Sequence, residues 1–284
     1  MKKFFPTLLL LLSCGLSAVA QPSGNPLVFG ENRLTLITPT LFRLEFARDG
    51  KFIDDPTIFA YDRSNLLPAD RFEVRALGGD RYEITTEALR IVYEHDGGLH
   101  NFAAYYKLNG KEKKFTNRCI FRNNLGGPVE TLDRVTGEIP MQDGLLSRDG
   151  WYVIDDERSD LLVDGWLRPR DTRSHVQDQY CFVYGNDYKA ALADLGAIGG
   201  RVPMTRKYIH GVWYCRYWDY TSEEFLSIID GYEQNDFPLD NLVFDMGWHT
   251  YTARTGTGHA GSRSWTGYTW ERERIPDPEA LIAE

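Results

Sequence analysis

The first two thirds of the chain carry short runs in which apolar and polar residues alternate. Residues 42–47 and 89–94 follow this period of two, which places successive side chains on opposite faces of a strand. Turn-forming pairs, Gly78-Gly79 and Asn109-Gly110, separate neighbouring runs. Several short strands joined by tight turns predict an antiparallel β-sandwich.

A different pattern begins near residue 200. We expect a helix over residues 187–195, a connector over residues 196–203, and then alternating strand and helix. Residues 209–214 predict a first parallel strand. Thr221 and Glu224 have the spacing of a capping box, and the apolar residues after them recur at helical spacing.

The second strand of this region ends on a carboxylate. Residues 241–246 read Asn-Leu-Val-Phe-Asp-Met, and such an apolar run predicts a parallel strand that is buried on both faces. Together with the preceding strand and helix it predicts a βαβ unit. In a barrel built of such units the chemistry takes place at the carboxyl ends of the strands. Asp245 is therefore a candidate functional residue.

These patterns divide the chain into three segments. Residues 1–20 form a predicted signal peptide, residues 21–200 a β-sandwich domain, and residues 201–284 the incomplete start of a βα-barrel. The predicted fold class is multi-domain, with an antiparallel β domain followed by the first βαβ portion of an α/β barrel. A helix that begins near Pro276 is the last expected element.

The amino-terminal residues have the order of a secretory signal. Lys2 and Lys3 precede an apolar run over residues 4–12, and Ala18-Val19-Ala20 supplies the small residues of a cleavage site. We expect cleavage after Ala20 and export to the periplasm or the exterior. A lipidated Cys14 at the mature amino terminus is the alternative. Neither this run nor a later one is long enough for a transmembrane segment.

Charge and cysteine content narrow the function classes. The 284 residues carry a net charge of −9, with no stripe of Lys and Arg, which argues against a nucleic-acid partner. Cys119, Cys181 and Cys215 lack the spacing of metal ligands, and we expect three buried thiols rather than a disulfide. No cofactor is expected, and the oligomeric state is unknown from the sequence.

Four motifs occur in a fixed order after residue 210. They are GVWYCRYW at 211–218, FPLD at 237–240, LVFDMGWH at 242–249, and WTGYTW at 265–270 followed by PDP at 276–278. Together they resemble glycoside hydrolase family 31, the family of α-glucosidases and α-xylosidases. Upstream, LSRDGW at 146–151 and YGNDY at 184–188 are similar to the amino-terminal region of that family.

The resemblance implies a galactose-mutarotase-like β-sandwich before a (β/α)8 barrel, and retaining hydrolysis of an α-glycoside or oligosaccharide. It implies that Asp245 binds hydroxyls of the sugar at the cleavage point, that Met246 lies beside it, and that Asp149 enters the same pocket from a sandwich-domain loop. The nucleophile and the acid/base of the family lie on later barrel strands. No catalytic residue is therefore assigned in this chain.

Two features depart from the family pattern. Gly247 stands where many relatives have a second acid in the motif. The loop over residues 250–264 is longer than the usual connector, and it either covers part of the pocket or is a surface excursion.

Each candidate residue also has a structural interpretation. Asp245 could be satisfied by an arginine or by backbone donors, and Asp149 could lie in an exposed turn. We expect Trp248 and Trp270 to pack at the barrel rim rather than to stack on the sugar. Arg216 is expected to have a structural role, for which an acid inside the barrel could be the partner.

A metal site formed by Asp245, His249 and His259 is disfavoured, because their spacing matches no ligand signature.

Two function classes follow from these features. The first is an exported glycosidase of family-31 type, of which this chain would supply sugar-holding groups but neither the nucleophile nor the acid/base. The second is a non-catalytic, secreted carbohydrate-binding or interaction module. Two parallel strands with open edges would suit a free-standing module poorly, which favours the first class.

Overall fold

The structure is a computed structural model that describes residues 24–129, 135–245, 247–249 and 268–284. The chain forms two compact units, Met1–Val202 and Pro203–Glu284. The predicted signal peptide, Cys14 and the loop over residues 250–264 lie outside the described residues. Within the described ranges, every helix falls short of the length and hydropathy that crossing a bilayer requires.

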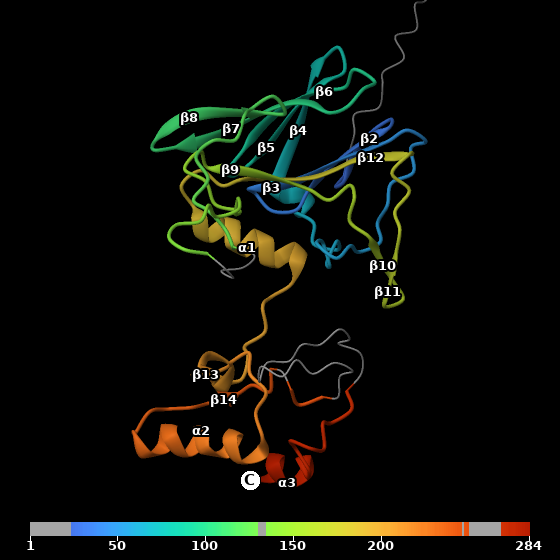
Figure 1. The fold of residues 1–284 in the computed structure, drawn as a ribbon. Coiled ribbons are helices and arrows are strands. Elements are labelled where there is room, and N and C mark those ends of the chain that lie inside the picture. The colour runs from blue at the N-terminus through green and yellow to red at the C-terminus, as the bar shows by residue number, and fades with distance from the viewer. Residues whose placement is uncertain (1–23, 130–134, 246, 250–267) are drawn as a thin grey trace, which may run out of the picture. The chain divides into compact units, whose positions relative to one another are not determined.

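Two five-stranded antiparallel sheets form the first unit and lie face to face (Figure 1). The first sheet has the order β1-β2-β3-β12-β9, with bounds β1 (Leu27–Phe29), β2 (Asn32–Leu36), β3 (Leu41–Ala47), β12 (His175–Val183) and β9 (Trp151–Asp155). The second is a meander of β4 (Phe72–Gly78), β5 (Arg81–Thr86), β6 (Arg90–Glu94), β7 (Asn101–Leu108) and β8 (Lys111–Thr116). The predicted β-sandwich is confirmed.

The core of this unit lies between the two sheets. Because side chains alternate along a strand, Phe42 and Leu44 of β3 face the second sheet, where they belong to the same buried cluster as Ile84 and Ile91. The β7–β8 hairpin turns at Asn109 and Gly110, whose φ values of 51° and 74° give the two-residue turn expected from this pair.

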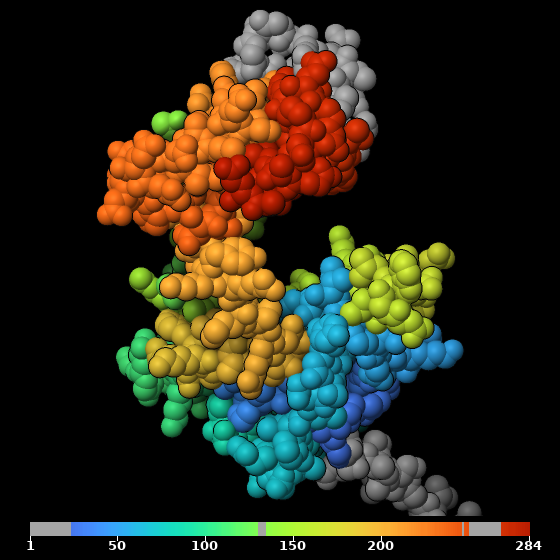
Figure 2. Space-filling view, turned by 90° about the horizontal axis from the view of Figure 1, so that it is seen from below, coloured from blue at the N-terminus to red at the C-terminus, as the bar shows by residue number. Residues whose placement is uncertain are grey.

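A third layer covers the outer face of the first sheet. It consists of α1 (Tyr188–Gly199), the segment over residues 50–65 and the hairpin of β10 (Leu161–Val163) and β11 (Trp166–Arg168). The short helix η1 (Ala69–Arg71) leads into β4 of the second sheet. Figure 2 shows the light-blue segment between the gold helix α1 and the lime hairpin. Thr57 forms a β-bridge with Leu161, so the segment and the hairpin hold each other in place.

The helix α1 is longer than predicted. Its N-cap is Asp187, whose side chain accepts a hydrogen bond from the Ala190 amide at 3.0 Å, but the helix continues to Gly199 instead of ending at residue 195. Ile198 is fully buried against the sheet, and its carbonyl accepts a hydrogen bond from the Asp62 amide at 2.8 Å. These tertiary contacts outweigh the low helix propensity of Gly196.

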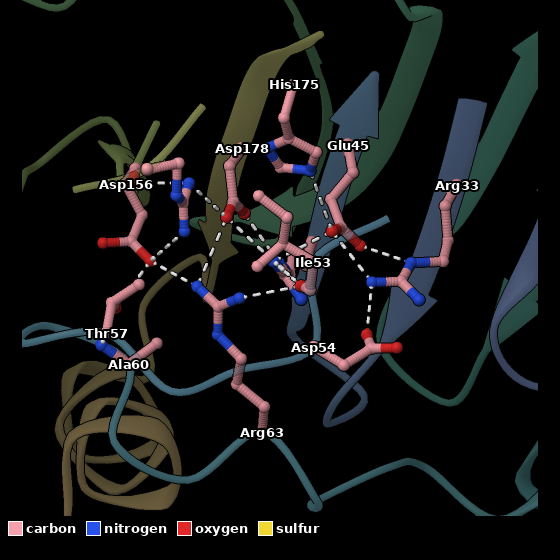
Figure 3. A network of polar contacts seen from close by, with 12 residues as sticks. Arg33, Glu45, Ile53, Asp54, Thr57, Ala60, Arg63, Asp156, His175 and Asp178 are labelled. Atoms are coloured by element: carbon pink, nitrogen blue, oxygen red, sulfur yellow. Dashed lines mark hydrogen bonds and ion pairs between the residues drawn. The ribbon is translucent and has the colours of Figure 1, made fainter. Parts of the chain in front are cut away.

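Buried ion pairs lie between the first sheet and this covering layer (Figure 3). Arg43 of β3 makes a two-pronged pair with Asp178 of β12, with N···O distances of 2.6 and 2.8 Å, and also reaches Glu45 at 2.9 Å. Four guanidinium groups and four carboxylates belong to this network, and all but one have nearly inaccessible side chains: Arg33, Arg43, Arg63, Arg170, Glu45, Asp54, Asp156 and Asp178, with Asp54 the exposed one.

Charge balance keeps these groups ionised away from water. Burial alone would raise the pKa of Asp178, but Arg43, Arg63 and Arg170 hold that pKa well below its usual range. Arg63 also pairs with Asp156 at 2.7 Å and donates to the backbone carbonyl of Ile53 at 3.0 Å. The network therefore joins the strands to the chain segments that cross them, and removal of a single partner would leave a buried charge uncompensated.

The second unit starts with the short helix η2 (Lys207–His210). It then contains β13 (Trp213–Tyr214), α2 (Ser222–Gln234), β14 (Asn241–Leu242) and α3 (Pro278–Ala283). The strands β13 and β14 are parallel and α2 connects them, which confirms the predicted βαβ unit. Thr221 and Glu224 form the predicted capping box, with both reciprocal hydrogen bonds present.

The predicted strand lengths and burial were wrong in this unit. Each strand has two residues rather than six, and 52% of Trp213 is exposed. Residues 209 and 210 belong to η2, and residues 241–245 are only half-buried. In the described residues β13 and β14 pair only with each other, so neither strand is enclosed on both sides as strands are inside a parallel sheet.

The prediction of three buried thiols was also wrong for two of the cysteines. Cys181 is buried in the sandwich core, whereas Cys119 and Cys215 are exposed, and all three are free. Burial raises the pKa of the Cys181 thiol well above its usual range, so this thiol stays neutral and unreactive.

A buried histidine gives the sandwich a predictable sensitivity to acid. The ring nitrogen Nε2 of His100 donates to the Glu45 carbonyl at 2.8 Å, and burial lowers the pKa of His100 from 6.5 to about 4. The unfolded chain therefore binds a proton between these values while the folded chain does not. As the pH falls from 7 to 4, the free energy of unfolding should drop by about 3 kcal/mol through this group.

Substitution of the residue isolates that contribution. In His100→Gln, which keeps a donor for the Glu45 carbonyl, chemical denaturation at pH 7 and pH 4 should show a smaller loss than in the parent chain. His210→Gln, at an exposed histidine, serves as the control and should follow the parent. Equal losses in all three proteins would show that His100 titrates normally.

Candidate functional site

Asp245 follows the carboxyl end of β14. The strand pair aligns Trp213 with Asn241 and Tyr214 with Leu242, and one further hydrogen bond, from the Val243 amide to the Tyr214 carbonyl at 2.9 Å, continues the ladder. The residues after Tyr214 and after Leu242 therefore leave the sheet at the same edge, as expected for parallel strands. The structure thus places Asp245 at the strand tip that the sequence indicated.

The thiol of Cys215 lies next to the Asp245 carboxylate. The pKa of Cys215 is raised, first by partial burial and then by the charge of Asp245 and a hydrogen bond to it. This neighbour was not expected from the sequence, although Cys215 directly follows β13 and Asp245 lies three residues past the end of β14. Asp245 is half-buried, and Met246 lies outside the described residues. The sugar-binding role of both residues stays a prediction.

An aromatic cluster packs around Phe244, the residue that precedes Asp245. Phe225 of α2 is fully buried and packs against Phe244 at a ring distance of 4.3 Å. Trp248 and Trp270 contact each other edge to face at 5.2 Å and pack against the same cluster, as predicted for these two side chains. The tip is therefore set on a rigid apolar base.

Gly247 occupies a position that no larger residue fits. Its φ is 72°, and a Cβ atom built there would lie 2.6 Å from Asp219 Oδ1 and 2.9 Å from Arg274 Nη1. Arg274 pairs with Asp219 at 3.2 Å and donates to the Gly247 carbonyl at 3.2 Å. Where many relatives have a second acid, this chain therefore has a glycine whose backbone packs closely against the ion pair of Asp219 and Arg274.

Arg216 lies on the exposed side of the same edge. Its guanidinium group stacks over the Trp218 ring at 4.6 Å, and hydrogen bonds with the hydroxyls of Tyr220 and Tyr214 raise the pKa of Arg216. These two hydroxyls are 2.7 Å apart. Among the described residues, Arg216 therefore contacts aromatic side chains of this unit rather than an acid, and its structural role stays a prediction.

Asp149 belongs to the first unit. Its carboxylate accepts hydrogen bonds from the Asn123 side chain at 2.7 Å and from the Asn123 amide at 3.3 Å, while its carbonyl accepts one from the Tyr106 hydroxyl at 2.6 Å. It borders an open hollow of about 460 Å³ that also contains Arg118 and Arg122. Asp149 is half-buried and not in a fully exposed turn. Its contribution to a pocket shared with Asp245 stays a prediction.

One set of side chains in the described residues has the composition of a metal site. Oxygen and nitrogen atoms of Glu45, His175 and Asp178 lie within 4.8 Å of one another. Guanidinium groups already occupy this space, since Arg43 contacts both carboxylates. A cation would have to displace a paired charge, so this cluster is an ion-pair network and not a metal centre. His259 lies outside the described residues.

Comparison with known proteins identifies the second unit. Residues 202–284 match the family model described as "Glycosyl hydrolases family 31 TIM-barrel domain". The resemblance to glycoside hydrolase family 31 is confirmed. The chain is also 28% identical over 190 residues to "Alpha-xylosidase XylQ" of Lactiplantibacillus pentosus, an alignment that covers 62% of this chain and 23% of the xylosidase.

Solved family-31 structures share the fold of both units. The dextranase of Flavobacterium johnsoniae complexed with isomaltotriose matches 93% of this chain with a TM-score of 0.58 and 16% identity. An α-xylosidase from a soil metagenome complexed with xylose matches 91% with a TM-score of 0.53 and 12% identity. The chain spans 37% of the first protein and 44% of the second.

The geometry at Gly247 leads to a test of the strand tip. In Gly247→Ala, the positive φ and the contact with Asp219 should lower the stability of the second unit by about 1–3 kcal/mol. Hydrogen exchange of the β13 and β14 amides measures this effect.

Gly231→Ala is the matched control for that substitution. Gly231 lies inside α2 with open space around its Cα, so alanine there should stabilise the helix by about 0.5–1 kcal/mol. Faster exchange in the Gly231 variant, or unchanged exchange in the Gly247 variant, would contradict the structure at this position.

Proposed function

We propose that these residues belong to a glycoside hydrolase that cleaves α-glycosidic bonds with retention, of α-glucosidase or α-xylosidase type, and that Asp245 grips hydroxyls of the sugar at the cleavage point. The observation that carries the proposal is a carboxylate at the tip of a parallel barrel strand within a family-31 segment. The α-xylosidase and the dextranase among the relatives support an α-glycoside as substrate.

The chemistry of a carboxylate suits this role. An ionised Asp is an acceptor only, so it can take hydrogen bonds from two sugar hydroxyls at once. In a retaining glycosidase the ring flattens toward an oxocarbenium ion between two carboxyl groups about 5 Å apart. A fixed carboxylate that holds the ring hydroxyls in this distorted shape stabilises the transition state more than the ground state. Asp149 and Met246 complete the proposed set of sugar-holding residues.

The proposal assigns no nucleophile and no proton donor to the described residues. Asp245 contacts the Cys215 thiol and follows Phe244 of the aromatic cluster, and neither neighbour supplies a second carboxylate for the displacement. The bond-breaking step is therefore assigned to barrel strands beyond the βαβ unit. The contribution of this segment is to bind and orient the sugar.

Substitution of Asp245 in the complete glycosidase tests the role directly. Asp245→Asn keeps the size of the side chain but replaces an acceptor with an amide that also donates. We expect kcat/KM for an aryl α-xyloside or α-glucoside to fall by roughly 10²–10⁴-fold, comparable to loss of one preorganised transition-state contact. The melting temperature should stay within a few degrees of the parent.

Asp240→Asn provides the control on the same strand. The Asp240 carboxylate accepts from the Val212 amide at 2.9 Å and so belongs to the start of β14 rather than its tip. Its substitution should leave kcat/KM nearly unchanged. If Asp245→Asn lowered the melting temperature while folded enzyme kept normal kcat/KM, Asp245 would be a structural residue and the proposal would be wrong.

A further inference from the structure

A hollow of about 520 Å³ opens where β8 and β9 end the two sheets of the sandwich. Its volume lies in the range of roughly 300–1,000 Å³ that is typical of small-molecule sites. The side chains around it come from both sheets and from the connections next to β8, and they include Phe121, Tyr152, Asp155, Gln177 and Gln179.

Polar side chains stand at inward-facing positions of this part of the first sheet. Gln177 and Gln179 have the same parity along β12 as Cys181 and Val183, which are buried in the core between the sheets. Asp155 of β9 is the register partner of Gln179. A β-sandwich normally has apolar residues at such positions. The neighbouring side-chain amides of Gln177 and Gln179 and the carboxylate of Asp155 therefore need an explanation.

Hydrogen bonds fix how these three groups point. The Asp155 carboxylate is an acceptor only, so the Gln179 amide turns its Nε2 group toward Asp155, at 2.5 Å. Gln179 Oε1 then faces Gln177 and accepts from Gln177 Nε2 at 2.7 Å. The remaining atom, Gln177 Oε1, has no hydrogen-bond partner in the described part of the chain. It is also buried, since only 8% of the residue is exposed.

This unpaired oxygen is the strongest sign of a ligand. A buried acceptor without a partner destabilises a fold, and the chain of hydrogen bonds prevents the Gln177 amide from exchanging the positions of its oxygen and nitrogen. Gln177 lines the hollow, so a ligand hydroxyl that displaces the side chains covering Oε1 can donate to this atom. The free atom therefore selects a ligand with an O–H or N–H donor.

The walls of the hollow narrow the class of ligand. Phe121 and Tyr152 are half-buried and 4.7 Å apart, and Trp151 packs behind Phe121 at 5.5 Å. Their apolar faces suit the C–H groups of a sugar ring. Asp143 and Asp155 supply further acceptors, and no Lys or Arg occurs among the lining residues of the described chain, which disfavours an anion.

We propose that this hollow binds a neutral, polyhydroxylated ring, with Gln177 Oε1 and Asp155 as acceptors for its hydroxyls and Phe121 and Tyr152 as its apolar platform. The choice of a saccharide over another polyol rests on the proposed function. All of the residues that line it belong to the sandwich unit. It would hold a stretch of glycan, or a free sugar, without taking part in bond cleavage.

Sugar titration into the whole chain tests this proposal. D-xylose, D-glucose and isomaltotriose are added separately, and the side-chain amide and indole signals are followed by ¹H–¹⁵N NMR. We expect at least one of the three sugars to shift the amide signals of Gln177 and Gln179 in a saturable manner. Gln177→Leu and Asp155→Ala should each raise the dissociation constant at least tenfold.

Asp155→Ala and Asp245→Asn make two distinctions. The first separates loss of the sugar contact from loss of the fold, and the second separates binding in this hollow from binding at the barrel. Asp155 is exposed, so Asp155→Ala keeps the fold even if Gln177→Leu does not. Asp245→Asn removes the proposed barrel contact and should leave the Gln177 and Gln179 shifts unchanged, so failure of the barrel assignment is distinguishable from failure of this one. Absence of saturable shifts with all three sugars overturns the proposal. So does binding that Asp155→Ala leaves intact, or that only Asp245→Asn removes.

Discussion

Buried ion pairs between arginine and carboxylate groups fix the sheet on which the rest of the first unit is built. Arg43 of β3 and Asp178 of β12 pair diagonally across the two strands, and neither can reach water once the covering segments are in place. The charges are stable there only because every carboxylate has a guanidinium partner. The same pairing bonds the crossing segments to the sheet, through contacts such as that of Arg63 with Asp156 and the Ile53 carbonyl.

The two faces of that sheet therefore differ in what they contact. Its outer face is closed by ion pairs and by α1, so strands β3 and β12 cannot change register without breaking charged contacts. The inner face is therefore held in one position relative to the second sheet. This rigidity is what lets β12 present Gln177 at an inward position with an unpaired oxygen, because a looser strand would rotate to satisfy it. The second unit uses aromatic packing under Asp245 for the same purpose.

The sequence predicts which segments form strands and helices, but it predicts the burial of their side chains and the lengths of the strands less well. Alternation over residues 42–47 predicts β3, but it does not show that Arg43 and Glu45 are buried, because Arg43 pairs with Asp178, which lies 135 positions away in the sequence. The motif around Asp245 locates the strand tip, since the tip of a parallel strand follows from local pattern. The lengths of β13 and β14 do not follow, because strand length depends on the neighbours that each strand meets.

The energetic role of the buried network is tested most directly by Arg43→Met, which keeps the side chain's bulk and removes its charge. The free energy of opening, measured by hydrogen exchange of the β3 and β12 amides, should fall by about 3–5 kcal/mol because Asp178 loses its principal partner. Arg75→Met, at a mostly exposed pair with Glu83, is the control and should change it by less than about 1 kcal/mol. Equal, small effects of both substitutions would contradict the account.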